Sequence, residues 1–570
     1  MSMLINADAE TRPVDGSRIS KTEIGVTVLI FLALLVLRWF YTSTRGWDSD
    51  EPQHLHVVWG WLNGLLPYRD LFDNHMPLFQ VMSVPLFASL GERADIVTAM
   101  RWAMVPLMAL GIVAIYFIGS RLFSRRIGLW GAVIAAAFPP VYFKMGEYRP
   151  DVLWAVIWLV ILAVVSSGTL RPRKLFFVGL LFGIAFCVSL KTTFLLLIFL
   201  AAAVVTLFVR FVRTKTPPDL SQIFKGVAVA ICGMLIVPLA VILFFASQNA
   251  LGPMYYCVIG HNLIGGGSVW QRLAVHLSDV RLWLFIPVLA IGLLLVKRAE
   301  NETIRFRRLF FLLVLSLFCP VLISTWPIIT KQDYIPFFSI LSIVIAALFV
   351  WAGERLHKAT NSFVPTFLLV TMVVLGEFVW MVKMCPPFEE RNKDDVATIA
   401  KTLNLTRPGE TVLDSKGQAI FRRRPFYYAL ETITRMRADK GEIIDDVPER
   451  LIAERTPVLI RCHWLTDATD KFVKQNYVSV GSSVLVLGKK LTPPADGKLQ
   501  FEVSVPGKYI MVDDDGDASG TLDGIDWQGP RELEPGTYTL ILNEVPKSLA
   551  IVWSRAVEKG YSPFLPAGAQ

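Results

Sequence analysis

Acidic side chains are concentrated in residues 46–61, which read GWDSDEPQHLHVVWGW. Asp48, Asp50 and Glu51 follow a long apolar run. A helix start explains part of this pattern, because carboxylates interact favourably with the helix dipole and Pro52 suits a first turn. A helix start does not need three carboxylates, however, and ionisable groups at membrane depth are costly unless they are used. The stretch is therefore a candidate for acid–base chemistry.

Other polar side chains interrupt the apolar sequence further along the chain. EYRPD (147–151) contributes Glu147, Arg149 and Asp151, and Asp151 could cap the helix that follows it, act in chemistry, or do both. Individual lysines could extend to lipid headgroups, and single histidines are weak signals of a ligand site. The remaining candidates are His54, His75, Lys191, His261, Lys331 and Tyr334.

The composition is that of a membrane protein. Of 570 residues, 54% are hydrophobic and 18% are charged, whereas soluble domains carry about 25% charged residues. The long apolar runs lie in residues 1–385, and residues 386–570 resemble soluble sequence. Lys and Arg fall mainly between the apolar runs, so we interpret the net charge of +9 as a topology signal and expect no nucleic-acid partner. The six cysteines include no CxxC pair, which argues against a zinc site or a disulfide framework.

The apolar runs predict about eleven membrane-spanning helices, since each is about 17–24 residues long. They begin near Ile24, Ile96, Ile127, Val152, Phe176, Thr193, Gly226, Leu282, Leu309, Ile335 and Phe363. A weaker run from Met76 to Leu90 contains two prolines. We predict that it lies in the outer membrane interface rather than crossing.

Alternate connections between the spans are rich in Lys and Arg, and by the positive-inside rule they face the cytoplasm. These basic segments are residues 12–21, 121–126, 171–174, 210–225, 297–308 and 355–358. Every polar cluster named above, and the C-terminal part of the chain, then lies on the opposite face. We therefore expect a multi-pass protein of a bacterial inner membrane with an extracytoplasmic site.

An outward-facing site with carboxylates on one loop and cations on others suits a reaction with an anionic leaving group. The chain has neither a Walker loop nor a Rossmann fingerprint, and nucleotide sugars and ATP are cytoplasmic. An activated donor should therefore arrive within the membrane, for example as a polyprenyl-phosphate sugar. Phosphate leaves without protonation, so one carboxylate base and cations for the phosphate would suffice.

The order of six short motifs resembles the GT-C superfamily of integral-membrane glycosyltransferases, over roughly residues 20–385. It is most similar to the branch of protein O-mannosyltransferases and the aminoarabinose transferase of lipid A. The motifs are Asp50-Glu51, NHMPL (74–78), RPD (149–151), LKTT (190–193), Gly260-His261 and KQDYIP (331–336). The chain departs from the family in having His-Met-Pro at residues 75–77 and Lys331 where many relatives have arginine.

The resemblance implies inverting transfer from a polyprenyl-phosphate sugar to a lipid, glycan or protein acceptor, by a hexosyl- or pentosyltransferase. It implies that Asp50 is the general base and Asp151 a supporting carboxylate. The predicted catalytic residues are Asp50, Glu51 and Asp151, with His75, Arg149, Lys191, His261, Lys331 and Tyr334 for the donor phosphate or substrate, and Asp48, Glu147 and His54 as further candidates. Asp48 is an acid that the family pattern does not require. A divalent cation is left open.

The C-terminal part predicts two extracytoplasmic domains. Residues 386–490 alternate helical and strand patterns, which is typical of a small α/β domain. Residues 497–570 read as short strands and turns, similar to the β-sandwich of carbohydrate-binding modules. Trp527, Tyr538 and Trp553 could stack on sugars or fill the core.

Two other functions stay open at this point. A non-catalytic protein that binds or assembles envelope polysaccharide would use the C-terminal module. A transporter fits less well, because transporters place polar groups near the midplane and often contain repeats. An Asp50→Asn substitution would separate catalysis from binding.

Overall fold

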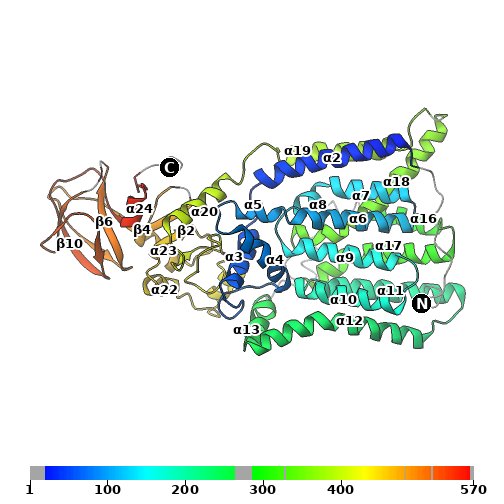
Figure 1. Cartoon of the computed structure of the whole chain (residues 1–570), viewed down its shortest axis with the longest axis horizontal. Helices are drawn as coiled ribbons and strands as arrows, with labels where there is room; N and C mark the ends of the chain where they lie inside the picture. Colours follow the sequence, from blue (N-terminus) through cyan, green and yellow to red (C-terminus); the bar gives the residue numbers. More distant parts are fainter. Residues whose placement is uncertain are drawn as a thin grey trace. The chain divides into compact units, whose positions relative to one another are not determined.

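The computed structural model describes residues 19–263, 285–326, 329–361, 363–481, 483–514, 516 and 518–564. The chain forms two compact units (Figure 1). The first, here the helical unit, comprises Met1–Arg45, Asn74–Met82 and Met100–Glu390. The second, the mixed unit, comprises Gly46–Asp73, Ser83–Ala99 and Arg391–Gln570. Residues 46–73 and 83–99, which we predicted within the membrane domain 1–385, therefore group with the C-terminal part.

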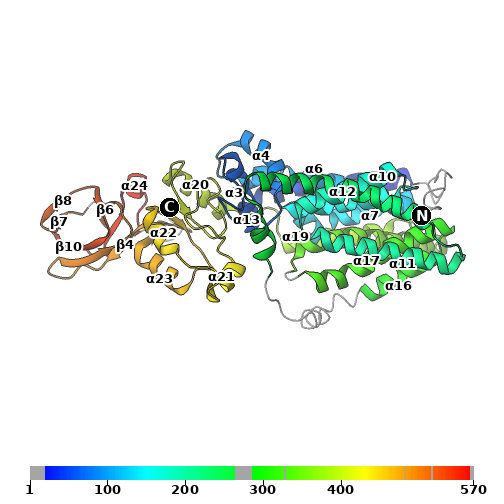
Figure 2. The ribbon, with the colours of Figure 1, turned by 90° about the horizontal axis from the view of Figure 1, so that it is seen from below.

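The helical unit is a bundle of long helices that run side by side (Figures 1 and 2). Within the described residues, six stretches are long and apolar enough to cross a membrane: Lys21–Thr44, Ile96–Leu122, Thr192–Thr214, Leu220–Ser247, Glu302–Thr325 and Lys331–Ala359. The helices of the unit are α2 (Lys21–Thr44), α6 (Met104–Leu122), α7 (Arg125–Ala137), α8 (Pro139–Lys144), α9 (Pro150–Ser166), α10 (Pro172–Val188), α11 (Thr192–Thr214), α12 (Leu220–Ser247), α13 (Leu251–Tyr255), α16 (Phe285–Lys297), α17 (Glu302–Thr325), α18 (Ile335–Ala359) and α19 (Leu368–Met384). The predicted polytopic helical fold is confirmed, whereas the number of eleven spans stays a prediction.

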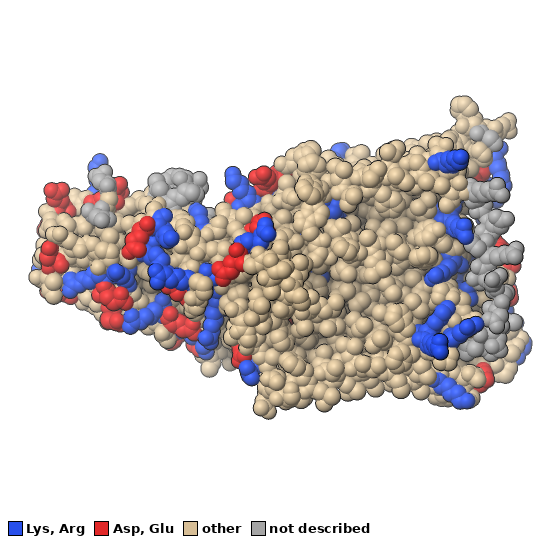
Figure 3. Space-filling model, viewed as in Figure 1, with Lys and Arg blue, Asp and Glu red and all other residues tan. Residues whose placement is uncertain are grey.

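The surface of the helical unit is that of a membrane protein. Large apolar side chains such as Leu29, Phe208, Phe224 and Leu243 are exposed, which water would disfavour and lipid would not. Figure 3 shows a broad face without charge, and Lys and Arg gather at one end of the bundle. The protein is therefore an integral, multi-pass membrane protein.

Small residues let two of these helices pack closely. A side chain at Gly179 or Gly183 of α10 would overlap a backbone carbonyl of α12, at Ala230 and Met234 respectively. Small residues at helix interfaces are typical of membrane bundles, because close backbone approach supplies the van der Waals contact that holds helices together in lipid. Glycine is thus required here for packing.

The weak apolar run at residues 76–90 forms helix α4 (Leu78–Leu90). It has 13 residues, and at about 1.5 Å per residue it is about 20 Å long. A bilayer core is about 30 Å thick, so α4 is too short to cross it upright. The interfacial position of this helix stays a prediction.

The mixed unit contains two sheets. The larger has the strand order β1-β2-β4-β11-β6-β9, with β3 also paired to β4, and the smaller has the order β5-β10-β7-β8. The β1–β2 pair is parallel and the other pairs are antiparallel. The strands are β1 (Val412–Leu413), β2 (Val458–Ile460), β3 (Tyr477–Ser479), β4 (Val484–Leu491), β5 (Lys498–Val503), β6 (Gly507–Asp513), β7 (Gly520–Leu522), β8 (Ile525–Trp527), β9 (Arg531–Leu533), β10 (Gly536–Leu542) and β11 (Leu549–Trp553). The helices are α3 (Asp50–Leu62), α5 (Ile96–Arg101), α20 (Lys393–Leu405), α21 (Thr432–Asp439), α22 (Val447–Ala453), α23 (Asp467–Asn476) and α24 (Ser554–Glu558). The last two residues of α5, Met100 and Arg101, belong to the helical unit.

Strand β4 joins the two regions that we predicted as separate domains. Its Val486 pairs with Val458 of β2, and its Lys489 pairs with Ile551 of β11. One sheet therefore runs from the predicted α/β region 386–490 into the β-rich region 497–570. The two regions share a continuous apolar core.

The aromatic residues that we considered for sugar stacking differ in burial. Trp527 and Trp553 are 2% and 7% exposed, so they fill the core of the mixed unit. Tyr538 is half-buried and stacks on Phe501, with 5.9 Å between the ring centroids. The two tryptophans therefore offer no sugar platform.

Candidate active site

The acidic stretch forms the start of α3, within the mixed unit. The Glu51 carboxylate accepts a hydrogen bond of 2.9 Å from the Asp48 N–H, and the Asp48 carboxylate accepts one of 3.2 Å from the Asp50 N–H. The bond to Asp50 satisfies one of the backbone donors that a helix start leaves without helical partners, and the bond to Asp48 ties Glu51 to the residue before the N-cap, Ser49. Asp48 and Glu51 thus have the structural role that a helix start predicts. His54 is buried in the same helix.

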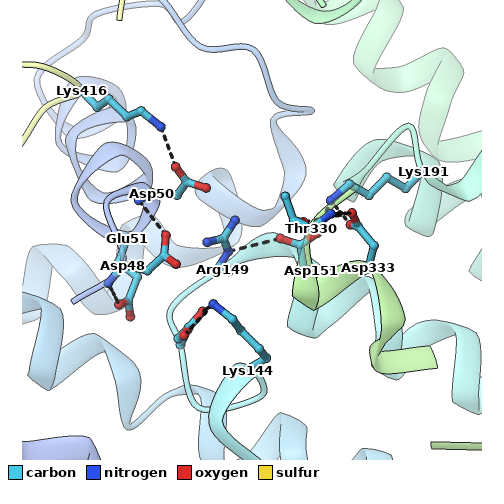
Figure 4. A network of polar contacts seen from close by, with 11 residues as sticks. Asp48, Asp50, Glu51, Lys144, Arg149, Asp151, Lys191, Thr330, Asp333 and Lys416 are labelled. Atoms are coloured by element: carbon cyan, nitrogen blue, oxygen red, sulfur yellow. Dashed lines mark hydrogen bonds and ion pairs between the residues drawn. The ribbon is translucent and has the colours of Figure 1, made fainter. Parts of the chain in front are cut away.

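Asp50 makes a different contact. Its Oδ1 lies 2.9 Å from the ammonium nitrogen of Lys416 (Figure 4). The same nitrogen is 3.4 Å from Glu431 Oε2. The Asp50 side chain is 23% exposed, so solvent and small molecules can reach it. Burial disfavours the charge on Lys416, but Asp50 and Glu431 outweigh it and raise the pKa of the lysine. A charged ammonium therefore faces an accessible carboxylate.

A buried turn places Lys416 at this position. Asp414 is fully buried, accepts hydrogen bonds from the N–H groups of Gly417 (2.6 Å) and Ala419 (2.8 Å), and pairs with Arg424 at 2.9 Å. Gly417 has φ +95°, a left-handed conformation that favours glycine. The turn is thus fixed from both sides of Lys416.

The same turn packs directly against α3. The His56 Nδ1 atom is 3.0 Å from the carbonyl oxygen of Ile420, and burial lowers the pKa of His56. A Cβ atom at Gly417 would lie 2.6 Å from His56 Cβ, so the absence of a side chain allows the approach. Lys416 and Glu431 were not predicted, because their link to Asp50 spans more than 300 residues and leaves no local pattern.

A second cluster lies in the helical unit and is built on Lys191. The ammonium nitrogen of Lys191 is 2.7 Å from Asp151 Oδ1 and 2.5 Å from Asp333 Oδ1 (Figure 4). The two carboxylates are 6% and 0% exposed. Burial disfavours the charge on Lys191, but the carboxylates outweigh it and raise the pKa of the lysine. The predicted residues Asp151 and Lys191 thus come together in a buried ion bridge.

The helix order puts this cluster at the end of the bundle away from the basic connections. Helix α9 begins at Pro150 and ends at Ser166, and Arg171, Arg173 and Lys174 follow. Helix α10 then returns and ends at Val188, three residues before Lys191. Asp151 and Lys191 therefore lie at one end of the helical bundle, and the basic connection between α9 and α10 lies at the other end.

Asp333 is a member of this cluster that sequence reasoning missed. Its Oδ2 accepts hydrogen bonds from the N–H (2.7 Å) and the hydroxyl (2.9 Å) of Thr330, which forms a capping box. The Thr-x-x-Asp spacing is the local signal for such a box. The two flanking residues that we predicted differ in position: Lys331 is exposed, and Tyr334 is half-buried against Phe338.

Arg149 and Glu147 contact different partners. The Arg149 Nε atom is 3.4 Å from Asp151 Oδ2, so Arg149 extends the Lys191 cluster. Glu147 is buried and is contacted by Lys144 at 2.8 Å and Arg45 at 2.9 Å. EYRPD thus contributes to two adjacent ion-pair groups.

The NHMPL and Gly-His motifs lie side by side. Asn262 Nδ2 donates to the Asn74 carbonyl oxygen at 3.0 Å, and Asn74 Nδ2 donates to Asn262 Oδ1 at 3.3 Å. His75 is among the groups whose charge acts on Asp151. His261 is buried beside Tyr256. The Lys191 cluster joins the RPD, LKTT and KQDYIP motifs, and His75 connects NHMPL to it. Asn262 directly follows Gly260-His261 and bonds to Asn74, so five of the six motifs are linked within the helical unit.

Positive charge beside the carboxylates comes from lysine in both clusters. Within the ranges that the structure describes, no group of three or more His, Cys, Asp or Glu side chains is arranged to hold a metal ion. Asp50 faces Lys416, and Asp151 faces Lys191. A divalent cation at the site stays an open prediction.

Comparison with known proteins places these clusters in a known fold. Residues 84–242 match the family model described as dolichyl-phosphate-mannose-protein mannosyltransferase. A comparison with curated proteins gives no match. Among solved structures, ArnT from Cupriavidus metallidurans bound to undecaprenyl phosphate is 14% identical with a TM-score of 0.56, covering 81% of this chain and 97% of ArnT. Its apo state is 15% identical with the same TM-score, covering 82% and 98%.

A third similar structure is the archaeal oligosaccharyltransferase AglB from Archaeoglobus fulgidus, in complex with an inhibitory peptide and a dolichol-phosphate. It is 9% identical with a TM-score of 0.49, covering 97% of this chain and 98% of AglB. The ArnT match confirms the predicted GT-C-like fold.

Proposed function

We propose that this chain, which has a GT-C-like fold, is an inverting glycosyltransferase that moves a sugar from a polyprenyl-phosphate donor to an acceptor on the outer face of the membrane. The observation that carries the proposal is the accessible Asp50 carboxylate held by the Lys416 ammonium at 2.9 Å. Two comparisons support the donor class: ArnT is described with bound undecaprenyl phosphate, and the matching family model describes transfer of mannose from dolichyl phosphate.

In the proposed reaction, Asp50 accepts the proton of an acceptor hydroxyl or amine. The acceptor atom forms a bond to the anomeric carbon of the sugar while the bond from that carbon to the phosphate oxygen breaks. The phosphate keeps the bonding electron pair and leaves as polyprenyl phosphate. Attack opposite the leaving group inverts the anomeric configuration, and no general acid is needed because phosphate leaves as an anion.

The donor phosphate requires cations that are not already neutralised. Lys191 faces two buried carboxylates, so we assign it to holding Asp151 in place rather than to binding phosphate. Lys331 is exposed next to Tyr334, which suits contact with a lipid phosphate. Arg149 keeps its predicted assignment to the donor phosphate or substrate in this proposal, and its Nε atom lies 3.4 Å from Asp151 Oδ2.

The charge pattern supports a proposal for the side of the membrane. The basic connections should face the cytoplasm, which makes the site and the residues 386–570 extracytoplasmic. We propose a bacterial inner membrane as the location. Both hexose and pentose donors fit this reaction.

The test is a transfer assay with the full chain in nanodiscs. Radiolabelled polyprenyl-phosphate sugars are offered as a panel with envelope extract as the acceptor source. Asp50→Asn keeps the shape and removes the base, and a general base contributes about 10²- to 10⁴-fold, so kcat should fall at least about 100-fold. Asp439→Asn is the matched control, because Asp439 forms an exposed ion pair with Arg435 in the same unit, outside the proposed site.

Full activity in folded Asp50→Asn protein would refute the assigned base. Failure of the folded wild-type chain to use any donor would instead favour a non-catalytic role in binding or assembling envelope polysaccharide. Label in protein, lipid or glycan would identify the acceptor class.

A further inference from the structure

The mixed unit contains a basic groove, distant in sequence from all the motifs above. Its cavity has a volume of about 790 Å³. Four cations and one carboxylate line it, together with polar side chains and Pro563. The charged lining residues are Arg461, Lys474, Lys489, Lys490 and Glu502, and the uncharged polar ones include Gln475, Ser479 and Ser504.

The sheet register explains why these cations converge. Strand β3 has three residues, and its first residue, Tyr477, pairs with Leu487 of β4. Strand β4 continues past that pair to Lys489 and Lys490, whose other neighbour is β11. Helix α23, whose last turn carries Lys474, contacts both β3 and β4. Cations from a helix and a strand therefore meet at one hollow.

The charge in this groove is only partly neutralised by the protein. Lys489 donates a hydrogen bond of 2.5 Å to the backbone oxygen of Glu502, which holds its ammonium in place without cancelling its charge. Lys474 pairs with Asp470, but the two side chains are 74% and 45% exposed, and such pairs are weak. The groove is positive overall and offers hydroxyl and amide groups beside the charges.

We propose that this groove binds an anionic glycan, that is, a sugar chain that carries phosphate or carboxylate groups. Its volume lies within the range of about 300–1,000 Å³ that is typical of ligand pockets. Ser479, Ser504 and Gln475 can exchange hydrogen bonds with sugar hydroxyls while the lysines bind the anionic groups.

Two other anionic partners fit the groove less well. A membrane surface is flat and cannot enter a hollow. Single-stranded nucleic acid is usually held by stacking on aromatic side chains. Tyr477 is the aromatic side chain among the lining residues, and it is buried, with its hydroxyl bonded to the Thr456 carbonyl at 2.9 Å. The glycan is therefore the partner that the lining favours.

The test measures binding without any donor, so its result does not depend on the proposed transferase activity. The full chain, in nanodiscs of zwitterionic lipid, is titrated with fluorescent trigalacturonate, phosphorylated maltotriose and neutral maltotriose. Lys489→Gln combined with Lys490→Gln removes two groove charges. The matched control is Lys508→Gln with Lys547→Gln, two exposed lysines of the same unit outside the groove. Thermal melts check that both variants are folded.

We expect at least one anionic trisaccharide to bind, with an affinity about tenfold lower in the groove variant and unchanged in the control. Binding should weaken as salt rises from about 50 mM to about 300 mM. The preferred trisaccharide distinguishes a phosphate-bearing glycan from a carboxylate-bearing one. Three results would overturn the proposal: equal loss in both variants, equal binding of neutral maltotriose, or binding to anionic vesicles or oligonucleotide but to no trisaccharide.

Discussion

Replacing Lys191 by Met should destabilise the helical unit strongly. The Lys191 ammonium lies 2.7 Å and 2.5 Å from two carboxylates that are 6% and 0% exposed. At an effective dielectric constant of about 20, Coulomb's law gives about 6 kcal/mol for each contact, before the cost of burying the charges. Removing one partner of a buried ion pair costs about 3–5 kcal/mol, because the remaining charge is left uncompensated. We expect a loss of that size.

The assay is thermal unfolding of the full chain in nanodiscs, followed by tryptophan fluorescence. Lys191→Met should lower the melting temperature by several degrees, and adding Asp151→Asn should recover part of the loss by removing one uncompensated charge. Lys331→Met is the control, since Lys331 is an exposed lysine next to the same cluster. Equal melting temperatures for the two lysine variants would refute the reasoning.

The pH dependence of this contribution has a definite sign. The pKa of Lys191 is raised in the folded protein by the two carboxylates, against the effect of burial. The stabilisation is therefore fully present below the unfolded lysine pKa of about 10.4 and is lost as pH rises through the higher folded value. Between about pH 7 and pH 9, the difference in stability between wild type and Lys191→Met should be constant.

Three further results are expected. In a transfer assay, Lys416→Met should reduce the rate by about tenfold or more, whereas Lys416→Arg should retain most of it, because the contact to Asp50 needs a cation. Equal rates for the two variants would contradict this role. Gly417→Ala should destabilise the chain by about 1–3 kcal/mol, measured by melting, because φ is +95° and the new Cβ would lie 2.6 Å from His56 Cβ. Transfer should persist in EDTA, because Lys191 and Lys416 already supply positive charge to the carboxylates of Asp151 and Asp50. If EDTA abolished the activity and Mg²⁺ or Mn²⁺ restored it, the enzyme would require a divalent cation.

The membrane helices were predictable because one physical constraint dominates them. Spans expected near Ile24, Thr193, Gly226, Leu309 and Ile335 correspond to α2, α11, α12, α17 and α18. A chain crossing lipid must satisfy its backbone hydrogen bonds within each segment and needs about 20 apolar residues to do so. Composition and length therefore suffice to find such helices without knowledge of their neighbours.

The membership of the polar clusters was less predictable, because it depends on contacts between distant segments. Asp151 and Lys191 come from motifs that we predicted, whereas Asp333 lies between the two residues of its motif that we selected. Lys331 and Tyr334 have the residue types expected for binding phosphate, but type alone does not tell which side chain turns inward. The capping box of Thr330 and Asp333 decides that orientation.

The grouping of α3 with residues 391–570 bears on what the C-terminal region does. The turn around Asp414 fixes Lys416 beside Asp50, and His56 fixes the same turn to α3. A chain that ended near residue 390 would keep Asp151, Lys191 and Asp333, but it would lose every contact of Asp50 with Lys416. On the proposed mechanism, the C-terminal region is therefore part of the catalytic apparatus, and the basic groove proposed to bind an anionic glycan belongs to the same unit as the base.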